Sequence, residues 1–338
     1  MSAVEALEDP GVLLAEPCLE FGSSRAVEAR GGIAVLPWRD TFLAAVAAGL
    51  AAQPLADGIP VGAYGQAVVH LQKGRAATVA DLAAAWRLLP LGGRLLVCGD
   101  NDLGIATFLK RLSEDLGQPS ELVANRAHGR IACFRRGERP PPEVPASTDV
   151  PLLPPAARGE PGADVMLAVA PGVFSADGLD GGTAALLGCL SQCPPPQRVL
   201  DLGCGAGHLA IAALVRWPRC VAVLADGDHR AVVCATANLA RLGLAERAQV
   251  AWWDAREAAP ARAIDLALVN PPFHRGQAVD LAPAKAMFRA LGEALAPGGR
   301  ALVVANRTLP YERDLASLGR VHVARQDSGF KVIQLLHE

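Results

Sequence analysis

One segment of this 338-residue chain has the residue types of a ligand-binding turn. Asp201 ends a short apolar run, and Gly203, Gly205 and Gly207 follow before the next apolar stretch begins. Glycines let the backbone approach a ligand closely, and the N-terminus of a following helix presents free N–H groups and positive potential. A carboxylate at this point repels a pyrophosphate but can pair with an amino-acid-like cation. The pattern therefore favours S-adenosylmethionine, which carries an ammonium and a sulfonium, over a dinucleotide.

Further aspartates follow the next two strand-like runs. Asp226 ends the first of them and is well placed to accept hydrogen bonds from both hydroxyls of a ribose. Asp228 lies close enough to compete, but we assign it as the N-cap of a helix that begins near His229. Asp254 follows the third strand-like run, where it could accept a hydrogen bond from an adenine amino group or serve as an ordinary turn residue.

A second chemistry-bearing segment is Asn270-Pro271-Pro272-Phe273-His274. Consecutive prolines stiffen a loop and fix the direction of the preceding carbonyls. The Asn270 side-chain oxygen and the Pro271 carbonyl would then form two acceptors that hold both hydrogens of a planar amine, leaving the nitrogen lone pair directed at a methyl donor. Phe273 offers a face on which the base could stack. The alternative is a loop that merely ends a strand.

The elements that must position these segments alternate along the C-terminal half. Apolar runs predict strands at 198–202, 221–224, 250–253, 266–269, 301–305 and 331–336, and helical patterns fall at 209–215, 229–242 and 283–295. This alternation predicts an α/β fold with a doubly wound, mainly parallel sheet. Ligands bind such sheets at the carboxyl ends of the strands, where both segments lie.

The two halves of the chain are similar to each other. Residues 89–97 match residues 295–303, and each follows a helical segment that is preceded by a strand-like run. This order indicates a duplicated α/β domain whose N-terminal copy is degenerate. A proline-rich stretch separates the copies, and we expect domains at 1–137 and 164–338 joined by a linker at 138–163.

Composition limits the class of protein. The net charge of −2 does not indicate a general nucleic-acid binder, so affinity for any nucleic acid would come from a local patch. No apolar run reaches the roughly 18 residues of a membrane helix, and the first residues lack the basic start of a secretory signal. Eight cysteines without a CxxC pair predict free thiols and no metal site. We expect a soluble cytoplasmic protein.

The motifs also resemble a known family. Asp-x-Gly-x-Gly-x-Gly followed by Asn-Pro-Pro-Phe is similar to class I S-adenosylmethionine-dependent methyltransferases that act on an exocyclic or amide nitrogen. Finer matches cover essentially the whole C-terminal half and resemble the bacterial ribosomal RNA guanine-N2 methyltransferases of the small-subunit type. These matches are 171–175, 177–182, 270–274, Ala305-Asn306, Leu309-Pro310-Tyr311 and 330–332.

The resemblance implies roles for individual residues. Gly203, Gly205, Gly207 and Asp226 would line the donor site, and Asn270 to Phe273 would hold the guanine. Asp180 and Thr183 would cap the donor site, and His274, Lys331 and Arg307 would contact RNA. His274 could instead act as a general base, and a lone lysine on an edge strand is commonly only a solvated residue that discourages aggregation.

The resemblance also implies a role for the N-terminal half. The family has two methyltransferase-like domains, of which the N-terminal one is degenerate. Here that half lacks the Gly-rich motif, and His70-Leu71-Gln72-Lys73 stands where Asn-Pro-Pro-Phe would fall. It should bind no donor, and either positions RNA or stabilises its partner domain.

We therefore expect an enzyme that methylates the N2 of a guanine in ribosomal RNA, with 16S rRNA of the small subunit as the expected substrate and a monomer as the expected state. The sister branch of the family modifies 23S rRNA. Similar Asn-Pro-Pro loops act on adenine N6 in DNA or on a protein glutamine, and an inactive assembly factor that binds rRNA is a further alternative.

Overall fold

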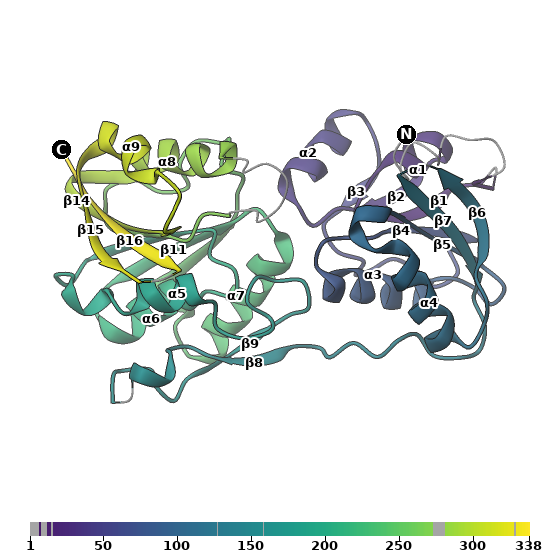
Figure 1. Ribbon diagram of the computed structural model, residues 1–338, viewed down its shortest axis with the longest axis horizontal. Helices are drawn as coiled ribbons and strands as arrows, with labels where there is room; N and C mark the ends of the chain where they lie inside the picture. The colour runs from purple at the N-terminus through teal and green to yellow at the C-terminus, as the bar shows by residue number, and fades with distance from the viewer. Residues whose placement is uncertain are drawn as a thin grey trace. The chain divides into compact units, whose positions relative to one another are not determined.

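The computed structural model describes residues 7, 12–14, 16–126, 128–157, 159–272, 281–327 and 329–338. It divides the chain into two compact units, Met1–Ala146 and Ser147–Glu338 (Figure 1). The division falls inside the proline-rich stretch that the sequence predicts as a linker. The second part of that stretch belongs to the second unit, because β8 (Thr148–Pro151) pairs antiparallel with β9 (Met166–Val169).

The second unit contains one seven-stranded sheet in the order β12-β11-β10-β13-β14-β16-β15. Neighbouring strands from β12 to β14 are parallel, whereas β16 runs antiparallel to both β14 and β15. This confirms the mainly parallel sheet. The strands are β10 (Arg198–Leu202), β11 (Val221–Asp226), β12 (Ala248–Trp252), β13 (Ile264–Val269), β14 (Leu295–Asn306), β15 (Gly319–Gln326) and β16 (Phe330–His337).

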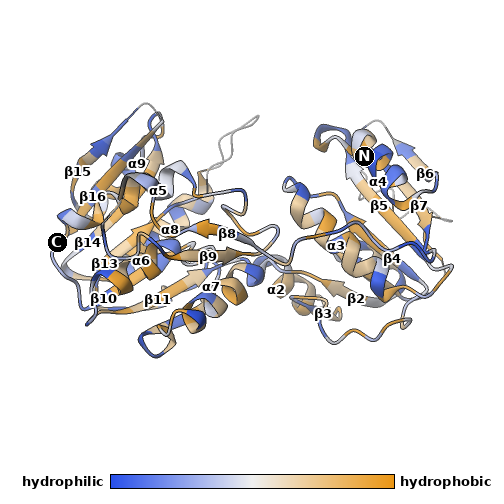
Figure 2. Cartoon of the chain, turned by 90° about the horizontal axis from the view of Figure 1, so that it is seen from below, coloured by the Kyte–Doolittle hydropathy of each residue, from blue (hydrophilic) through white to orange (hydrophobic). Residues whose placement is uncertain are grey.

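Helices cover both faces of this sheet. Figure 1 shows α8 and α9 on one face and α5, α6 and α7 on the other, and each face has its own buried apolar core. The helices are α5 (Gly181–Leu187), α6 (His208–Arg216), α7 (His229–Arg241), α8 (Ala282–Ala294) and α9 (Tyr311–Leu315). Strands that are buried on both faces are mostly apolar, and the predominantly orange strands of Figure 2 show this hydropathy. Among the described residues, no helix has the length and apolar character needed to cross a membrane.

The first unit repeats this architecture with its strands in the order β3-β2-β1-β4-β5-β7-β6. Separate apolar cores again lie on the two faces of its sheet. The strands are β1 (Cys18–Phe21), β2 (Gly32–Val35), β3 (Ala52–Gln53), β4 (Gln66–His70), β5 (Arg94–Asp100), β6 (Glu121–Arg126) and β7 (Gly129–Arg135), and the helices are α1 (Arg25–Arg30), α2 (Arg39–Ala47), α3 (Arg75–Leu88) and α4 (Ile105–Leu116). The predicted duplication is confirmed.

The strand registers align the two units residue by residue. Glu20 lies opposite Val68 in the first sheet, as Asp201 lies opposite Leu268 in the second. Counting two residues on from each partner makes His70 equivalent to Asn270. Arg94 and Arg300 likewise pair with equivalent residues of β4 and β13, which is the match that the sequence predicts between 89–97 and 295–303.

A buried charge network occupies these positions in the first unit. The Glu20 carboxylate is fully buried and accepts hydrogen bonds from the backbone N–H groups of Ala26 (2.8 Å) and Val27 (3.0 Å). His70 Nε2 lies 2.7 Å from Glu20 Oε1, and His70 Nδ1 lies 3.1 Å from Cys98 Sγ. Burial alone would lower the pKa of His70, but Cys98 and Glu20 outweigh it and raise the pKa to about 10. The imidazolium is therefore held inside the sheet.

We expect the ion pair between His70 and Glu20 to make the first unit less stable at alkaline pH than at neutral pH. An unfolded histidine titrates near 6.5, so the stabilisation is complete below that pH and is lost as the pH rises through about 10. His70→Gln should cost about 3 kcal/mol at pH 6.5, because it leaves Glu20 buried without its cation. The cost should shrink toward pH 10. Denaturant unfolding, followed by hydrogen exchange in peptides of the first unit, measures the free-energy cost of His70→Gln at each pH. A cost that does not change with pH would contradict the assignment of a charged His70.

Candidate active site

The two predicted segments meet at the point where the strand order of the second sheet reverses. The chain runs outward from β10 to β12 and then returns to β13 on the other side of β10. The Gly-rich segment leaves the carboxyl end of β10, and Asn270 leaves that of β13. A Cβ atom added to Gly203 would lie 3.7 Å from the Asn270 carbonyl oxygen. Such a reversal opens the crevice in which α/β sheets bind ligands.

The Gly-rich turn depends on backbone conformations that favour glycine. Gly203, Gly205 and Gly207 all have positive φ, at 73°, 53° and 93°. The Gly203 N–H donates to the Ala225 carbonyl (2.8 Å), which ties the turn to β11. A side chain on Gly203 would also come within 3.3 Å of Met287 Cε. The turn therefore depends on glycine for its backbone conformation, and its predicted contact with a donor stays a prediction.

Asp201 lies beneath this turn and is fully buried. Its Oδ2 accepts a hydrogen bond from the Ala210 N–H of α6 (2.9 Å), so it fixes the helix to the strand. Burial, with a smaller contribution from the charge of Asp226, raises the pKa of Asp201 to about 7. Its Oδ1 has no hydrogen-bond partner among the described residues. A buried carboxylate oxygen without a partner is costly, so the site fits a ligand that brings a cation or a hydrogen-bond donor.

Asp226 joins the Gly-rich turn to the start of α7. Its Oδ2 accepts from the Gly205 N–H (2.8 Å) and its Oδ1 from the Asp228 N–H (2.9 Å). Burial raises its pKa to about 6, against the lowering effect of these N–H groups. Each carboxylate oxygen keeps a second lone pair, so Asp226 can still accept two hydroxyls. The N-cap assignment of Asp228 is confirmed, since its side chain accepts from the Arg230 N–H.

Asp254 forms a local turn with Arg256. The Arg256 N–H and guanidinium donate to Asp254 Oδ1 (2.8 and 2.7 Å), and the guanidinium also reaches Oδ2 (3.0 Å). This is the ordinary turn role that the sequence offers as one alternative. A contact between Asp254 and adenine stays a prediction.

Asn270 is brought together with two residues almost ninety positions earlier in the chain. Its Nδ2 lies 3.0 Å from Thr183 Oγ1 and 3.3 Å from Asp180 Oδ2. Asp180 is the N-cap of α5, and its Oδ2 also accepts from the Thr183 N–H (2.9 Å). The sequence places Asp180 and Thr183 near the donor only through the family resemblance. The spacing of residues along the sequence does not predict their contact with Asn270.

The structure describes the Asn-Pro-Pro segment as far as Pro272. Pro271 is buried, whereas Pro272 is exposed. Phe273 and His274 lie outside the described residues, so their predicted contacts with the base and with RNA stay predictions.

The two basic residues predicted to contact RNA differ in their surroundings. Arg307 is exposed in the turn at the carboxyl end of β14. Lys331 lies on β16, which has a partner on each side, so the expectation of an edge strand is wrong. Its side chain is only 8% exposed, and its Nζ pairs with Glu312 Oε1 at 2.6 Å. In this structure its ammonium is paired with a carboxylate, and a contact between Lys331 and RNA stays a prediction.

Two aromatic residues from the matched segments 171–175 and 330–332, to which the sequence assigned no role, lie beside glycines of the site. Phe330 packs against the glycine pair at the start of α5, where an added Cβ on Gly181 would lie 3.0 Å from its ring. Phe174 is 55% exposed beside Gly205. The next residue, Ser175, has a φ of 69°, a strained conformation of the kind found at functional sites.

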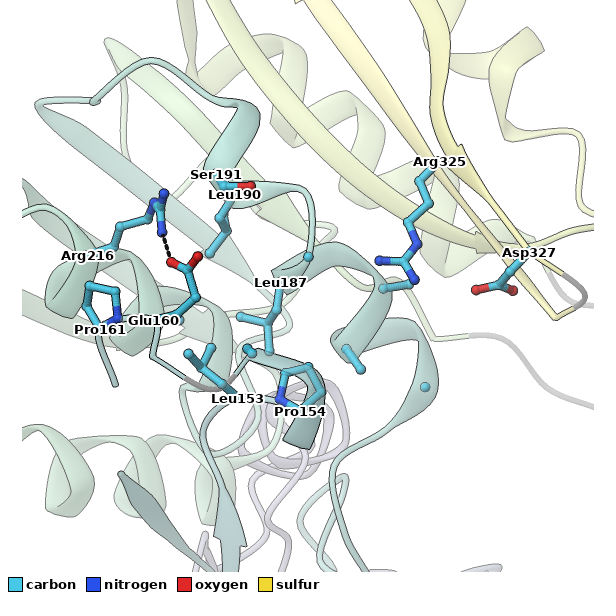
Figure 3. A pocket seen from close by; sticks show the side chains of 16 residues that line it. Leu153, Pro154, Glu160, Pro161, Leu187, Leu190, Ser191, Arg216, Arg325 and Asp327 are labelled. Atoms are coloured by element: carbon cyan, nitrogen blue, oxygen red, sulfur yellow. Dashed lines mark hydrogen bonds and ion pairs between the residues drawn. The ribbon is translucent and has the colours of Figure 1, made fainter. Parts of the chain in front are cut away.

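A separate hollow of about 520 Å³ lies behind α5 (Figure 3). It is lined by α5, α6 and the segments around Pro154 and Arg325, and the Arg216–Glu160 ion pair (2.7 Å) closes one end. Asp201, Asp226 and Asn270 do not line it. The chemistry-bearing residues therefore belong to the crevice at the strand ends and not to this hollow.

Comparison with known proteins agrees with this geometry. The family model of the methyltransferase small domain matches residues 164–334. A ribosomal RNA small subunit methyltransferase C of Pseudomonas aeruginosa (strain LESB58) is 35% identical over 275 residues, which cover 81% of this chain and 79% of that protein. A ribosomal RNA large subunit methyltransferase G of Ectopseudomonas mendocina (strain ymp) is 42% identical over 149 residues, which cover 44% and 40%.

A solved structure matches nearly the whole chain. The T. thermophilus 16S rRNA N2 G1207 methyltransferase (RsmC), in complex with AdoMet and guanosine, is 27% identical with a TM-score of 0.84. The match covers 99% of this chain and 92% of that one. Fold and site together define a class I S-adenosylmethionine-dependent methyltransferase with two Rossmann-like units. Within that class, the chain belongs to the ribosomal RNA small subunit methyltransferase C family.

We expect donor affinity to weaken as the pH falls through about 6, because only an ionised Asp226 accepts both ribose hydroxyls well. Below that pH the dissociation constant of S-adenosylmethionine should rise by up to about tenfold per pH unit, the limit for one linked proton. Calorimetric titration from pH 8 to 5 measures this. Asp226→Asn should bind weakly and lack the step near pH 6. A step near pH 7 that remains in this variant would report the titration of Asp201, whereas a step near pH 6 that remains would contradict the assignment of Asp226.

Proposed function

We propose that this protein transfers the methyl group of S-adenosylmethionine to the exocyclic N2 of a guanine in 16S rRNA. The observation that carries the proposal is the juxtaposition of the Gly-rich turn with Asn270, whose side-chain Nδ2 is held by Asp180 and Thr183. One segment suits the donor and the other suits a planar amine. Membership of the small subunit methyltransferase C family supports the same reaction.

The residues around β10 and β11 would hold the donor. The backbone at Gly203 and Gly205, which has no side chain, would approach its amino-acid part, and the unpartnered Oδ1 of Asp201 beneath the turn fits the positive charge of the ligand. Asp226 would accept the ribose hydroxyls, and Asp254 lies at the end of β12 on the adenine side. When bound, S-adenosylmethionine supplies a methyl group on a sulfonium, which makes that carbon electrophilic.

Asn270 and Pro271 would hold the acceptor. Their oxygens accept the two N–H hydrogens of guanine N2, which turns the nitrogen lone pair out of the plane of the base and toward the donor. Catalysis then rests on placing the nitrogen about 3 Å from the methyl carbon and on excluding water. The methylated nitrogen carries a positive charge and releases its proton readily, so these residues need not include a strong base. A guanine in a helix would first be flipped out, at a cost of a few kcal/mol.

The choice of 16S over 23S rRNA follows from the extent of the two similarities. The likeness to the large subunit methyltransferase G covers less than half of either protein, whereas the likeness to the small subunit methyltransferase C covers about four-fifths of each. The structural relative is a 16S rRNA N2 G1207 methyltransferase in complex with guanosine. We therefore propose the corresponding guanine of 16S rRNA as the target.

The first unit would act without a donor of its own. Ala26, whose helical N–H binds Glu20, lies four positions after Gly22. Ala210, whose N–H binds Asp201, lies seven positions after Gly203. The shorter turn lacks the Gly-rich backbone, and the Glu20–His70 pair fills the space between the strand ends. We propose that this unit positions RNA or stabilises the second unit, and that the protein works as a cytoplasmic monomer.

The reaction is tested with labelled S-adenosylmethionine, which is offered with the protein to small subunits, large subunits and stripped rRNAs. We expect N2-methylguanosine in 16S rRNA and in no other RNA, as identified by nucleoside mass spectrometry. Label in 23S rRNA alone would transfer the assignment to the large subunit. Bound donor with no label in any RNA would favour another planar nitrogen or an inactive assembly factor.

We expect Asn270→Ala to lower kcat by about two to three orders of magnitude, because it removes one of the two acceptors that orient the amine. Donor affinity and RNA binding should change by less than about threefold, as calorimetry and filter binding would show. Methyl transfer at nearly the wild-type rate would contradict the role of Asn270.

A further inference from the structure

The start of α5 contacts Asn270 through a hydrogen-bond network in which Asn270 is the donor and the residues of α5 and its N-cap are the acceptors. Asp180 Oδ2 accepts from the Thr183 N–H (2.9 Å), from Thr183 Oγ1 (3.4 Å) and from Asn270 Nδ2 (3.3 Å). Thr183 Oγ1 gives its proton to Asp180 and accepts from Asn270 Nδ2 (3.0 Å). Both groups that face Asn270 are therefore acceptors.

This polarity decides the orientation of the Asn270 amide. An ionised carboxylate can only accept, so the end of the amide that faces Asp180 must be the NH₂ group. The amide is planar, and its oxygen leaves the same carbon in a different direction. With Nδ2 held against α5, Oδ1 points away from that helix. An amide turned over would bring an oxygen against the Asp180 carboxylate and would offer the substrate amine a donor in place of an acceptor.

Burial, the N-cap and an aromatic ring surround this network. Thr183 is 5% exposed, and its N–H closes the N-cap of α5 on Asp180. Cβ atoms on Gly181 and Gly182 would lie 3.0 and 3.3 Å from the Phe330 ring, so the ring packs directly on the helix start. Packing of this kind keeps a side chain in one rotamer, which a functional amide requires.

We propose that Asp180 and Thr183 are positioning residues for the methyl acceptor: they fix Asn270 so that its Oδ1, and not its Nδ2, faces the substrate amine. This proposal rests on the proposed N-methyltransferase function. It differs from the role that the family resemblance implies for the two residues, which is to cap the donor site. Their contribution should therefore appear in the rate of methyl transfer and not in the affinity for S-adenosylmethionine.

Single substitutions separate the two roles. Thr183→Val keeps the shape but removes the hydroxyl, and Asp180→Asn keeps an oxygen that can cap Thr183 but adds an NH₂ that lets the Asn270 amide turn over. Each should lower kcat about tenfold or more, with the dissociation constant of S-adenosylmethionine within about threefold of wild type. Thr183→Ser, the matched control, keeps the hydroxyl and should lie much closer to wild type than Thr183→Val. An equal loss of donor affinity and of kcat would overturn the proposal.

An exchange of the two groups provides a stricter test. Asn270→Asp alone sets two carboxylates against each other, whereas Asp180→Asn combined with Asn270→Asp restores a donor–acceptor pair with its polarity reversed. Position 270 then again presents an acceptor to the amine. The double variant should be about tenfold more active than either single variant. Losses that simply multiply would show that the two side chains are not coupled and would overturn the proposal.

A measurement without turnover completes the test. In protein labelled with ¹⁵N-asparagine, the Asn270 side-chain NH₂ is assigned by its absence in Asn270→Asp. Its protons should exchange slowly with water in the wild type and in Thr183→Ser but quickly in Thr183→Val, whose unfolding temperature reports that it is folded. Fast exchange in the wild type would overturn the proposal. A wild type that binds the donor but methylates no RNA, while its NH₂ exchanges slowly, would instead contradict the proposed function alone.

Discussion

The site of this protein depends on one constraint: five parallel strands of the second sheet are covered by helices on both faces, so polar chemistry is confined to their ends. Within β10 and β13 the side chains are apolar except at Asp201 and at two residues near the strand starts, Arg198 of β10 and Asp265 of β13. At the carboxyl ends the chain turns between strand and helix, and backbone N–H groups become available. Gly203, Asp226 and Asn270 all lie there because the core excludes them elsewhere.

The two units meet this constraint in different ways. In the first unit the carboxylate of Glu20 accepts hydrogen bonds from two backbone N–H groups and pairs with the imidazolium of His70. Both carboxylate oxygens of Glu20 therefore already have partners within the protein. In the second unit the equivalent Asp201 has a single backbone partner and one oxygen without any among the described residues. A duplicated sheet thus holds one site closed by its own side chains and one that a ligand completes.

Charges near the second site show the same dependence on partners. Lys331 sits inside the sheet, and it is tolerated there because Glu312 supplies a carboxylate at 2.6 Å. Asp180 is part of no ion pair with a described residue, but three hydrogen bonds converge on its Oδ2. In both cases the group that looks available in the sequence is already committed to another part of the fold, which changes the role that can be assigned to it.

The features that could be predicted from the sequence depend on neighbouring residues. Glycine spacing after a strand indicated the turn from Gly203 to Gly207, consecutive prolines indicated the segment after Asn270, and apolar runs indicated most of the strands and the duplication. The order of strands within the sheet and the contacts between distant side chains became visible only in the folded chain. Contacts such as Asn270 with Thr183, His70 with Glu20 and Lys331 with Glu312 depend on strand register and helix packing over long sequence separations, and residue spacing carries no signal for them. The same holds for β8. Its proline-rich surroundings predict a linker, and it is a strand because it pairs with β9.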